Sequence, residues 1–128
     1  MSFILDTHAF LWWITDDARL SPRARDCIRN ADNDVFLSIA SAWEIAIKTQ
    51  LGRLHLPERA DRFVPAQLTR NGFQPLPIQM SHALYVGQLP NIHRDPFDRL
   101  IIAQSVLEKM SIVTRDTNIS KYNVKTIW

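Results

Sequence analysis

The sequence has few of the residues on which several classes of protein depend. It holds one cysteine, Cys27, in 128 residues, so no internal disulfide can form, and its four histidines show no spacing with cysteine that would indicate a zinc site. With three glycines it has neither a P-loop nor a Gly-rich dinucleotide turn, and no G-x-S-x-G motif occurs. No apolar run approaches the roughly 18 residues of a membrane span, so we expect no membrane partner.

The composition predicts one ordinary globular domain. Apolar residues make up 46% of the chain and charged residues 22%, which are typical of globular proteins. A length of 128 residues is near the commonest domain size, so we expect a single domain over residues 1–128. The first residues lack the basic region and cleavage site of a signal peptide, and we expect a cytoplasmic location.

Short apolar strands alternate with helical patterns along the chain. Strand patterns occur at 2–5, 34–38, 73–78, 111–114 and 124–128. Helical patterns occur at 7–14, 21–31, 41–52, 58–72, 81–90 and 95–110. Because parallel neighbours need a helical crossover, this alternation predicts an α/β fold with a mostly parallel sheet. The proline-bounded pattern at 73–78 is typical of an edge strand.

Several local details of the helices are also predicted. Ser21 and Ser81 are candidate N-caps. Trp43 opens a series of apolar residues at helical spacing in 41–52. Pro65 should break or kink the helix at 58–72 because proline lacks the backbone N–H.

Four acidic residues fall where one edge of such a sheet would lie. Asp6 ends the first strand, Glu44 lies near the start of the helix after the second, and Asp98 is in the first turn of the longest helix. Asp116 follows the strand that ends at Thr114. Carboxyl ends of parallel strands and amino ends of the following helices share one edge, so we expect these carboxylates to converge.

Each acid also has a structural interpretation that is favoured when it is taken alone. Asp6 and Asp95 can cap helices, and Asp116 can sit in the turn "RDTN". Glu44 completes a capping-box pattern in "SAWE" and can pair with Lys48 four residues later. Caps and turns are commoner than metal sites.

Taken together, the four acids indicate a metal site. Close carboxylates repel by roughly 4 kcal/mol per pair at an effective dielectric near 20, and cations between them remove that cost. Hard oxygen ligands select Mg²⁺ or Mn²⁺, and such sites suit phosphodiester hydrolysis. With four of the 13 acids set aside, 15 Lys and Arg face nine acids elsewhere, a surplus that favours a phosphate backbone as partner.

Four segments carry a resemblance to a known family. They are "ILDTHAFLWW", "SIASAWEIAIK", "LPNIHRDPFDRLIIAQS" and "IVTRDTNISKYNVKTIW". In this order they resemble the PIN-domain ribonucleases that act as VapC toxins of type II toxin–antitoxin pairs. The resemblance implies a PIN-like α/β/α sandwich, RNA cleavage that depends on Mg²⁺ or Mn²⁺, and a homodimer. It also implies a VapB-like antitoxin that covers the active-site groove in a heterotetramer or larger assembly.

The resemblance assigns residues by position. Asp6, Glu44, Asp98 and Asp116 match the family's catalytic, metal-binding acids. Asp95 belongs to a "DPFD" form of the motif, so we interpret it as the helix cap and as a candidate outer-shell ligand.

Other side chains flank these acids in the sequence. Thr7 and Thr114 are candidates to orient carboxylates or water, or they bond only the backbone. The candidates for contact with RNA phosphates are Arg94, Arg99, Arg115 and Lys48, although a solvated arginine is as common and Lys48 can simply pair with Glu44. Adjacent Trp12 and Trp13 cannot share a helix face, so we expect one of them at a dimer or antitoxin surface. The stretch 57–77 is assigned to dimerisation or substrate selection.

Two other functions remain open at this point. A receiver-type phospho-acceptor domain also binds Mg²⁺ at strand ends, but it needs paired acids after the first strand, and Asp6 stands alone there. A PIN-like protein that binds RNA without cutting it would have no use for four retained acids. The sequence therefore predicts the nuclease.

Overall fold

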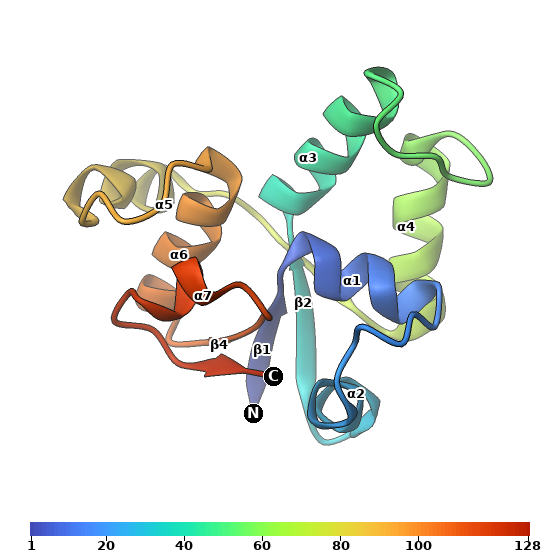
Figure 1. Ribbon diagram of the computed structural model, residues 1–128, viewed down its shortest axis with the longest axis horizontal. Helices are drawn as coiled ribbons and strands as arrows, with labels where there is room; N and C mark the ends of the chain where they lie inside the picture. Colours follow the sequence, from blue (N-terminus) through green and yellow to red (C-terminus); the bar gives the residue numbers. More distant parts are fainter.

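The computed structural model describes residues 1–128 and contains one five-stranded sheet between two layers of helices (Figure 1). All neighbouring strands are parallel, in the order β3-β2-β1-β4-β5. The strands are β1 (Ser2–Leu5), β2 (Asp34–Ser38), β3 (Gln74–Leu76), β4 (Ser111–Val113) and β5 (Thr126–Ile127). The predicted parallel sheet and the edge position of β3 are confirmed.

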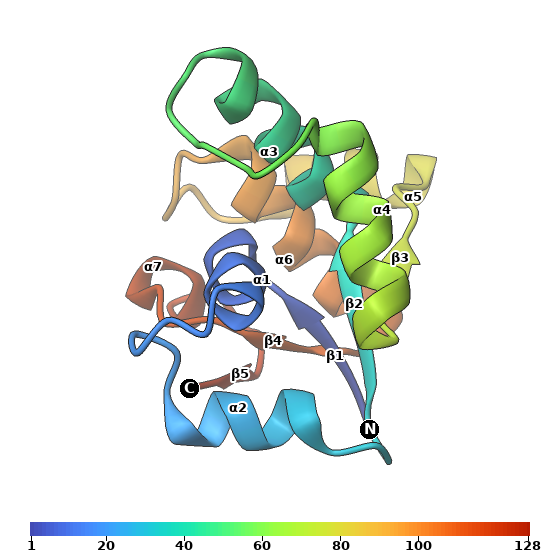
Figure 2. The ribbon, with the colours of Figure 1, turned by 90° about the vertical axis from the view of Figure 1, so that its right-hand side faces the viewer.

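Helices cover both faces of the sheet. One layer holds α1 (Thr7–Ile14), α2 (Pro22–Arg29) and α4 (Ala60–Asn71). The other holds α5 (Met80–Tyr85), the short 3₁₀ helix η1 (Val86–Gln88), α6 (Pro96–Glu108) and α7 (Thr117–Ser120). The remaining helix, α3 (Ile39–Gln50), leaves the end of β2 and contacts α1 and α4 on one side and α6 on the other (Figure 2). No helix is both long and apolar enough to cross a membrane.

The core lies on both sides of the central strands. In β1, Phe3 and Leu5 belong to the cluster beneath α1, α2 and α4, whereas Ile4 belongs to the cluster beneath α6 and α7. In β4, Val113 belongs to the cluster beneath α1, α2 and α4, and Ile112 belongs to the cluster beneath α6 and α7. A strand that is buried on both faces must be apolar throughout, which is why these strands stand out in the sequence.

The strand order places a crevice at one point of the sheet. The chain adds β2 and β3 on one side of β1, and β4 and β5 on the other. Parallel sheets form binding crevices at the carboxyl ends of strands where the order reverses in this way. Asp6 follows β1 and Asp116 follows β4, so both lie beside this switch point.

The structure corrects the predicted start of α3. Its N-cap is Ser38, whose hydroxyl accepts a hydrogen bond from the N–H of Ala40 at 3.0 Å. Ser41 therefore lies inside the helix and is buried, and the capping box with Glu44 does not form. The buried face consists of Ala40, Ser41, Glu44 and Ile45, which leaves Trp43 56% exposed.

Further details concern the caps, a proline and the two adjacent tryptophans. The cap of α5 is Gln79, in a capping box with His82, and Ser81 is not the cap. Helix α4 continues through Pro65 without a break. Trp12 and Trp13 both pack on the core beside α1, and the indole N–H of Trp13 donates to Oδ1 of Asn71 at 3.0 Å. Trp12 also lines the groove between α1, α3 and α4, and the expectation that one of this pair lies at a dimer or antitoxin surface stays a prediction.

Candidate metal centre

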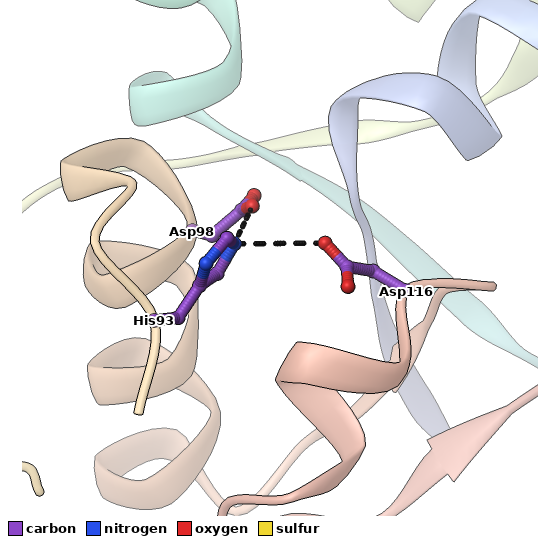
Figure 3. Close-up of side chains that lie close together, drawn as sticks. All are labelled: His93, Asp98 and Asp116. Carbon is purple, nitrogen blue, oxygen red and sulfur yellow. Dashed lines mark hydrogen bonds and ion pairs between the residues drawn. The ribbon is translucent and has the colours of Figure 1, made fainter. Parts of the chain in front are cut away.

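Asp98 and Asp116 meet at the carboxyl edge of the sheet, and His93 lies between them (Figure 3). Nε2 of His93 is 2.8 Å from Oδ2 of Asp98 and 3.5 Å from Oδ2 of Asp116. One ligand atom from each of the three residues lies within 4.8 Å of the others. The three come from different segments: the loop before α6, the first turn of α6 and the loop before α7 (Figure 3).

The amino end of α6 sets the position of Asp98. Asp95 is the N-cap, and its Oδ1 accepts hydrogen bonds from the N–H groups of Phe97 at 2.9 Å and Asp98 at 3.1 Å. Pro96 occupies the first helical position, where its missing N–H costs nothing. Asp98 is thus the third residue of the helix, and its carboxylate is left free of the cap. The predicted capping role of Asp95 is confirmed.

Asp116 serves two purposes with its two oxygens. Oδ1 caps α7 by accepting from the N–H of Asn118 at 2.8 Å, while Oδ2 faces His93. The hydroxyl of Thr114 accepts a hydrogen bond from the Asp116 N–H at 3.0 Å, which holds the turn between strand and helix.

Asp6 divides its oxygens in the same way. Oδ1 caps α1 by accepting from the N–H of Ala9 at 2.8 Å, and Oδ2 accepts from the Thr114 hydroxyl at 2.5 Å. Asp6 is only 6% exposed. Thr114 therefore links the acids that follow β1 and β4. Asp6 and Asp116 each cap a helix with one carboxylate oxygen and direct the other toward neighbouring side chains of the site.

Glu44 stands apart from this group. It is buried, and both of its oxygens are occupied: Oε1 accepts from the Thr7 hydroxyl and Oε2 from Nζ of Lys48, each at 2.6 Å. It does not belong to the set of ligand atoms around His93. The structure thus brings Asp98 and Asp116 together with Asp6 beside them, and connects Glu44 to the site through Thr7, the neighbour of Asp6.

The electrostatics of the site favour a bound cation. Burial, followed by repulsion from Asp95, raises the pKa of Asp98 to about 7, against the lowering effect of the His93 hydrogen bond. Burial also raises the pKa of Asp6, and the nearby Asp116 adds to that shift. A raised carboxylate pKa means that the folded protein disfavours the charged form, and a positive ion bound between these carboxylates would offset the repulsion among them.

The donor atoms fit a divalent metal. Neighbouring ligands of an octahedral ion with bonds of 2.0–2.1 Å lie about 3 Å apart, which is close to the separations of Nε2 from the two Oδ2 atoms. Asp98 and Asp116 would hold such an ion, with Asp6 beside them. Carboxylate oxygens are the hard ligands that Mg²⁺ and Mn²⁺ accept.

The basic residues near the site differ in their availability. The guanidinium of Arg99 donates to the carbonyls of Val86 and Pro90 and to the Tyr122 hydroxyl, each at 3.0 Å. These bonds tie Arg99 to the loop before α6 and favour a structural role, so its candidate role as a phosphate contact stays an untested prediction. Lys48 pairs with Glu44, the simpler of its two interpretations. Arg94 is exposed.

A cleft of about 300 Å³ opens beside the acids. Its lining consists of Asp6, His8, Trp12, Arg19, Arg115 and Asp116. The guanidinium carbons of Arg19 and Arg115 lie 4.8 and 4.6 Å from the centre of the Trp12 ring. Two cations thus border a cleft that contains two of the acids.

Sequence reasoning missed His93 and Arg19. His93 comes five residues before Asp98 in "HRDPFD", and a search for zinc spacing with cysteine cannot find a histidine that belongs to an acid cluster. One signal was available: His93 lies just before a predicted helix, and the first turn of that helix contains the expected ligand Asp98. Arg19 had no such signal, because only the fold brings it to Trp12.

Comparison with known proteins adds evidence from outside the structure. A family model described as PIN domain matches residues 3–125. Ribonuclease VapC16 of Mycobacterium tuberculosis (strain ATCC 25618 / H37Rv) is 39% identical over 61 residues, which cover 48% of this chain and 43% of that protein. Ribonuclease VapC22 of the same strain is 27% identical over 129 residues, covering 98% of this chain and 97% of that protein.

A solved structure has the same fold. The crystal structure of VapBC2 from Rickettsia felis bound to a DNA fragment from their promoter contains a chain with a TM-score of 0.70 and 14% identity. The match covers 98% of this chain and 97% of that one. At this identity the likeness establishes the arrangement of helices and strands.

Proposed function

Because this chain belongs to the PIN-domain family, we propose that it is a divalent-metal-dependent endoribonuclease and the toxin of a type II toxin–antitoxin pair. The ribonuclease names of VapC16 and VapC22 support the activity. Because the chain is a PIN domain, the alternative of a receiver-type phospho-acceptor domain no longer applies. A cytoplasmic place of action follows from an RNA substrate.

The observation that carries this proposal is the carboxylate pair at the switch point of the sheet. Asp98 and Asp116 lie within reach of one ion, and the buried Asp6 is joined to them through Thr114. We assign Asp6, Asp98 and Asp116 to the metal, which is Mg²⁺ or Mn²⁺. A metal bound here supplies hydroxide and neutralises the phosphate.

Glu44 completes the proposed catalytic set from a second position. Its carboxylate accepts hydrogen bonds from Thr7 and Lys48, and Thr7 is the residue next to Asp6. We propose that it joins the acids when RNA and metal are bound and Lys48 turns toward a phosphate. Lys48 is 37% exposed, so it has room to do so.

The RNA backbone is proposed to cross the cleft beside Asp6 and Asp116. Arg115 and Arg19 border this cleft, and Arg94 is exposed near His93. Guanidinium groups bind phosphates through paired N–H donors. None of these contacts reads a base, so they position the strand and leave the choice of sequence to other residues.

A larger groove is proposed as the place of the antitoxin. It has a volume of about 840 Å³ and runs between α1, α3 and α4. Its lining combines apolar side chains such as Leu11 and Phe63 with the basic Arg53. His8, Trp12 and Arg19 line both this groove and the smaller cleft, so a segment seated in the groove would reach the acids. The VapBC2 complex supports a partner of the VapB type.

A homodimer is proposed as the form of the toxin, within a heterotetramer or larger assembly with the antitoxin. Exposed apolar side chains support it. They are Ile39 (41% exposed), Trp43 (56%) and Leu51 (61%) on and after α3, and Met80 (79%) and Leu84 (69%) on α5. Ile39 and Trp43 lie four residues apart and therefore on one side of α3, and adjoining exposed apolar side chains mark contact surfaces.

The direct test is cleavage of a mixed RNA pool that includes transfer RNAs. The purified chain should produce discrete bands with Mg²⁺ or Mn²⁺ and none with chelator. Bands that persist in chelator would contradict the proposal. Binding of RNA without any cleavage would favour a PIN-like protein that does not cut.

A further inference from the structure

We propose that Nε2 of His93 is a direct ligand of the metal at this site, and that the site consequently prefers Mn²⁺ to Mg²⁺. The inference rests on the proposed function, since it concerns the same metal. It goes beyond the carboxylate ligands proposed above, because it adds a nitrogen ligand and predicts which of the two ions binds more tightly.

The placement of Nε2 is the first support. It lies 2.8 Å from Oδ2 of Asp98 and 3.5 Å from Oδ2 of Asp116, and Figure 3 shows the two contacts leaving the same ring nitrogen in different directions. Ligands that share an octahedral ion are about 3 Å apart. The imidazole nitrogen thus occupies a ligand position relative to both acids, whereas a residue that merely oriented Asp98 would need to approach only that one.

The loop that carries His93 is fixed from several sides. The backbone N–H of His93 donates to the Tyr122 hydroxyl at 2.9 Å, and that of Ile92 donates to the same oxygen at 3.3 Å. Arg99 donates to the carbonyl of Pro90 and to the Tyr122 hydroxyl, each at 3.0 Å. The His93 side chain is 17% exposed. An imidazole held in this way loses little further freedom when it binds an ion.

The other histidines have different surroundings. His82 is buried in the capping box of α5 and lies 2.9 Å from Glu108. His55 is exposed. His8 is exposed and stacks on Trp12 with a centroid distance of 5.4 Å. Only His93 belongs to a cluster that could hold a metal ion.

The ligand type predicts the ion. Mg²⁺ prefers oxygen donors and gives up its water reluctantly, whereas imidazole nitrogen suits first-row transition ions. Replacing one oxygen of the set by Nε2 therefore favours Mn²⁺. The remaining proposed donors, the carboxylate oxygens of Asp6, Asp98 and Asp116, accept either ion.

The test is pulsed electron paramagnetic resonance of Mn²⁺ bound to the metal-free full chain. Bound Mn²⁺ should show the modulation of a directly coordinated ¹⁴N nucleus, and the pattern should change to that of ¹⁵N when the protein carries ¹⁵N-labelled histidine. The signal should disappear in His93→Gln and remain in His8→Gln and His55→Gln. This measurement on the wild-type chain does not depend on whether a variant folds.

Titration calorimetry supplies the second readout. His93→Gln should weaken Mn²⁺ binding by about tenfold or more, and Mg²⁺ binding by less than about threefold. His55→Gln is the matched control and should change neither affinity.

Three outcomes would overturn the inference. Bound Mn²⁺ without nitrogen coupling would restrict His93 to positioning Asp98 and leave the proposed nuclease intact. A nitrogen signal that vanishes in His8→Gln instead would place the ion nearer Asp6. Failure of the wild-type chain to bind either ion would remove the proposed function together with the inference.

Discussion

The hydroxyl of Thr114 donates a hydrogen bond of 2.5 Å to Oδ2 of Asp6, across 108 positions of the chain. It joins the carboxyl ends of β1 and β4, the two strands between which the order of the sheet reverses. The hydroxyl oxygen of Thr114 also accepts a hydrogen bond from the N–H of Asp116 at 3.0 Å. One small side chain thus sets the relative positions of two of the proposed metal-binding acids.

Thr114→Val should impair the site while keeping the fold, since valine has the same shape without the hydroxyl. Asp6 would lose a buried hydrogen bond, which costs about 1–3 kcal/mol of stability, and metal affinity should fall about 10–100-fold. Calorimetry with Mn²⁺ measures the affinity. Thr114→Ser keeps the hydroxyl and should stay near wild type; equal losses in both variants would show that packing of the methyl group matters instead.

Asp98→Asn should stabilise the metal-free protein increasingly as the pH rises. The folded pKa of Asp98 is about 7, above its ordinary value of 3.8. Between about pH 4 and pH 7 the unfolded chain releases this proton while the folded chain retains it, so wild-type stability falls across that window. Because asparagine does not ionise, the variant should not lose stability in this way. It should be more stable than the wild type at pH 8 by roughly 1–3 kcal/mol.

Urea denaturation in chelator at pH 4, 6 and 8 measures this difference. Asp6, whose pKa is raised in the same direction, remains in both proteins, so the difference between them reports mainly on Asp98. A difference that is constant with pH would mean that Asp98 is ionised throughout.

The cap of α6 predicts opposite results for two changes at one position. Asp95→Asn should leave stability nearly unchanged, because asparagine caps as well as aspartate, whereas Asp95→Ala should cost about 1 kcal/mol. Thermal unfolding measures both. Equal stability of the two variants would show that the hydrogen bonds to Phe97 and Asp98 contribute nothing.

Arg115 and Arg99 should differ in their effect on RNA binding. In an Asp98→Asn background, which prevents cleavage, Arg115→Gln should lower the slope of log affinity against log salt by about 0.7–1. Arg99→Gln should leave that slope unchanged and reduce stability instead, because it leaves carbonyls near α6 without a donor.

Arg23, exposed on α2, provides the matched control for loss of one positive charge. Arg23→Gln should change neither the slope nor the stability by a measurable amount. A slope that drops equally in the Arg23 and Arg115 variants would indicate a diffuse electrostatic attraction with no defined phosphate contact.

The sequence predicted the strands well because of how they are buried. β1 and β2 have the predicted bounds, since strands covered on both faces are apolar throughout and are flanked by polar residues. Helix starts were less predictable where several cap residues compete. Ser38 and Ser41 are both good N-caps, and the contact of the Ser38 hydroxyl with Oε1 of Gln104 at 2.5 Å is a tertiary feature that no local pattern contains.

The site was predictable in part for a related reason. The acids after β1 and β4 could be placed from strand ends alone. Glu44 could not, because its position depends on where α3 begins. Capping a helix and binding a metal do not exclude each other in one aspartate. Asp6 and Asp116 each cap a helix with Oδ1, while Oδ2 contacts Thr114 in Asp6 and faces His93 in Asp116.

The most direct test compares RNA cleavage by Asp98→Asn and Asp95→Asn in Mn²⁺. The two substitutions are chemically identical and lie three residues apart, at the N-cap and in the first turn of α6, so each removes one negative charge from the same region. Asp98→Asn should lower the cleavage rate by at least about 100-fold, and Asp95→Asn should stay within about threefold of wild type. Wild-type cleavage by Asp98→Asn, or complete loss in Asp95→Asn alone, would contradict the assignment of the metal centre.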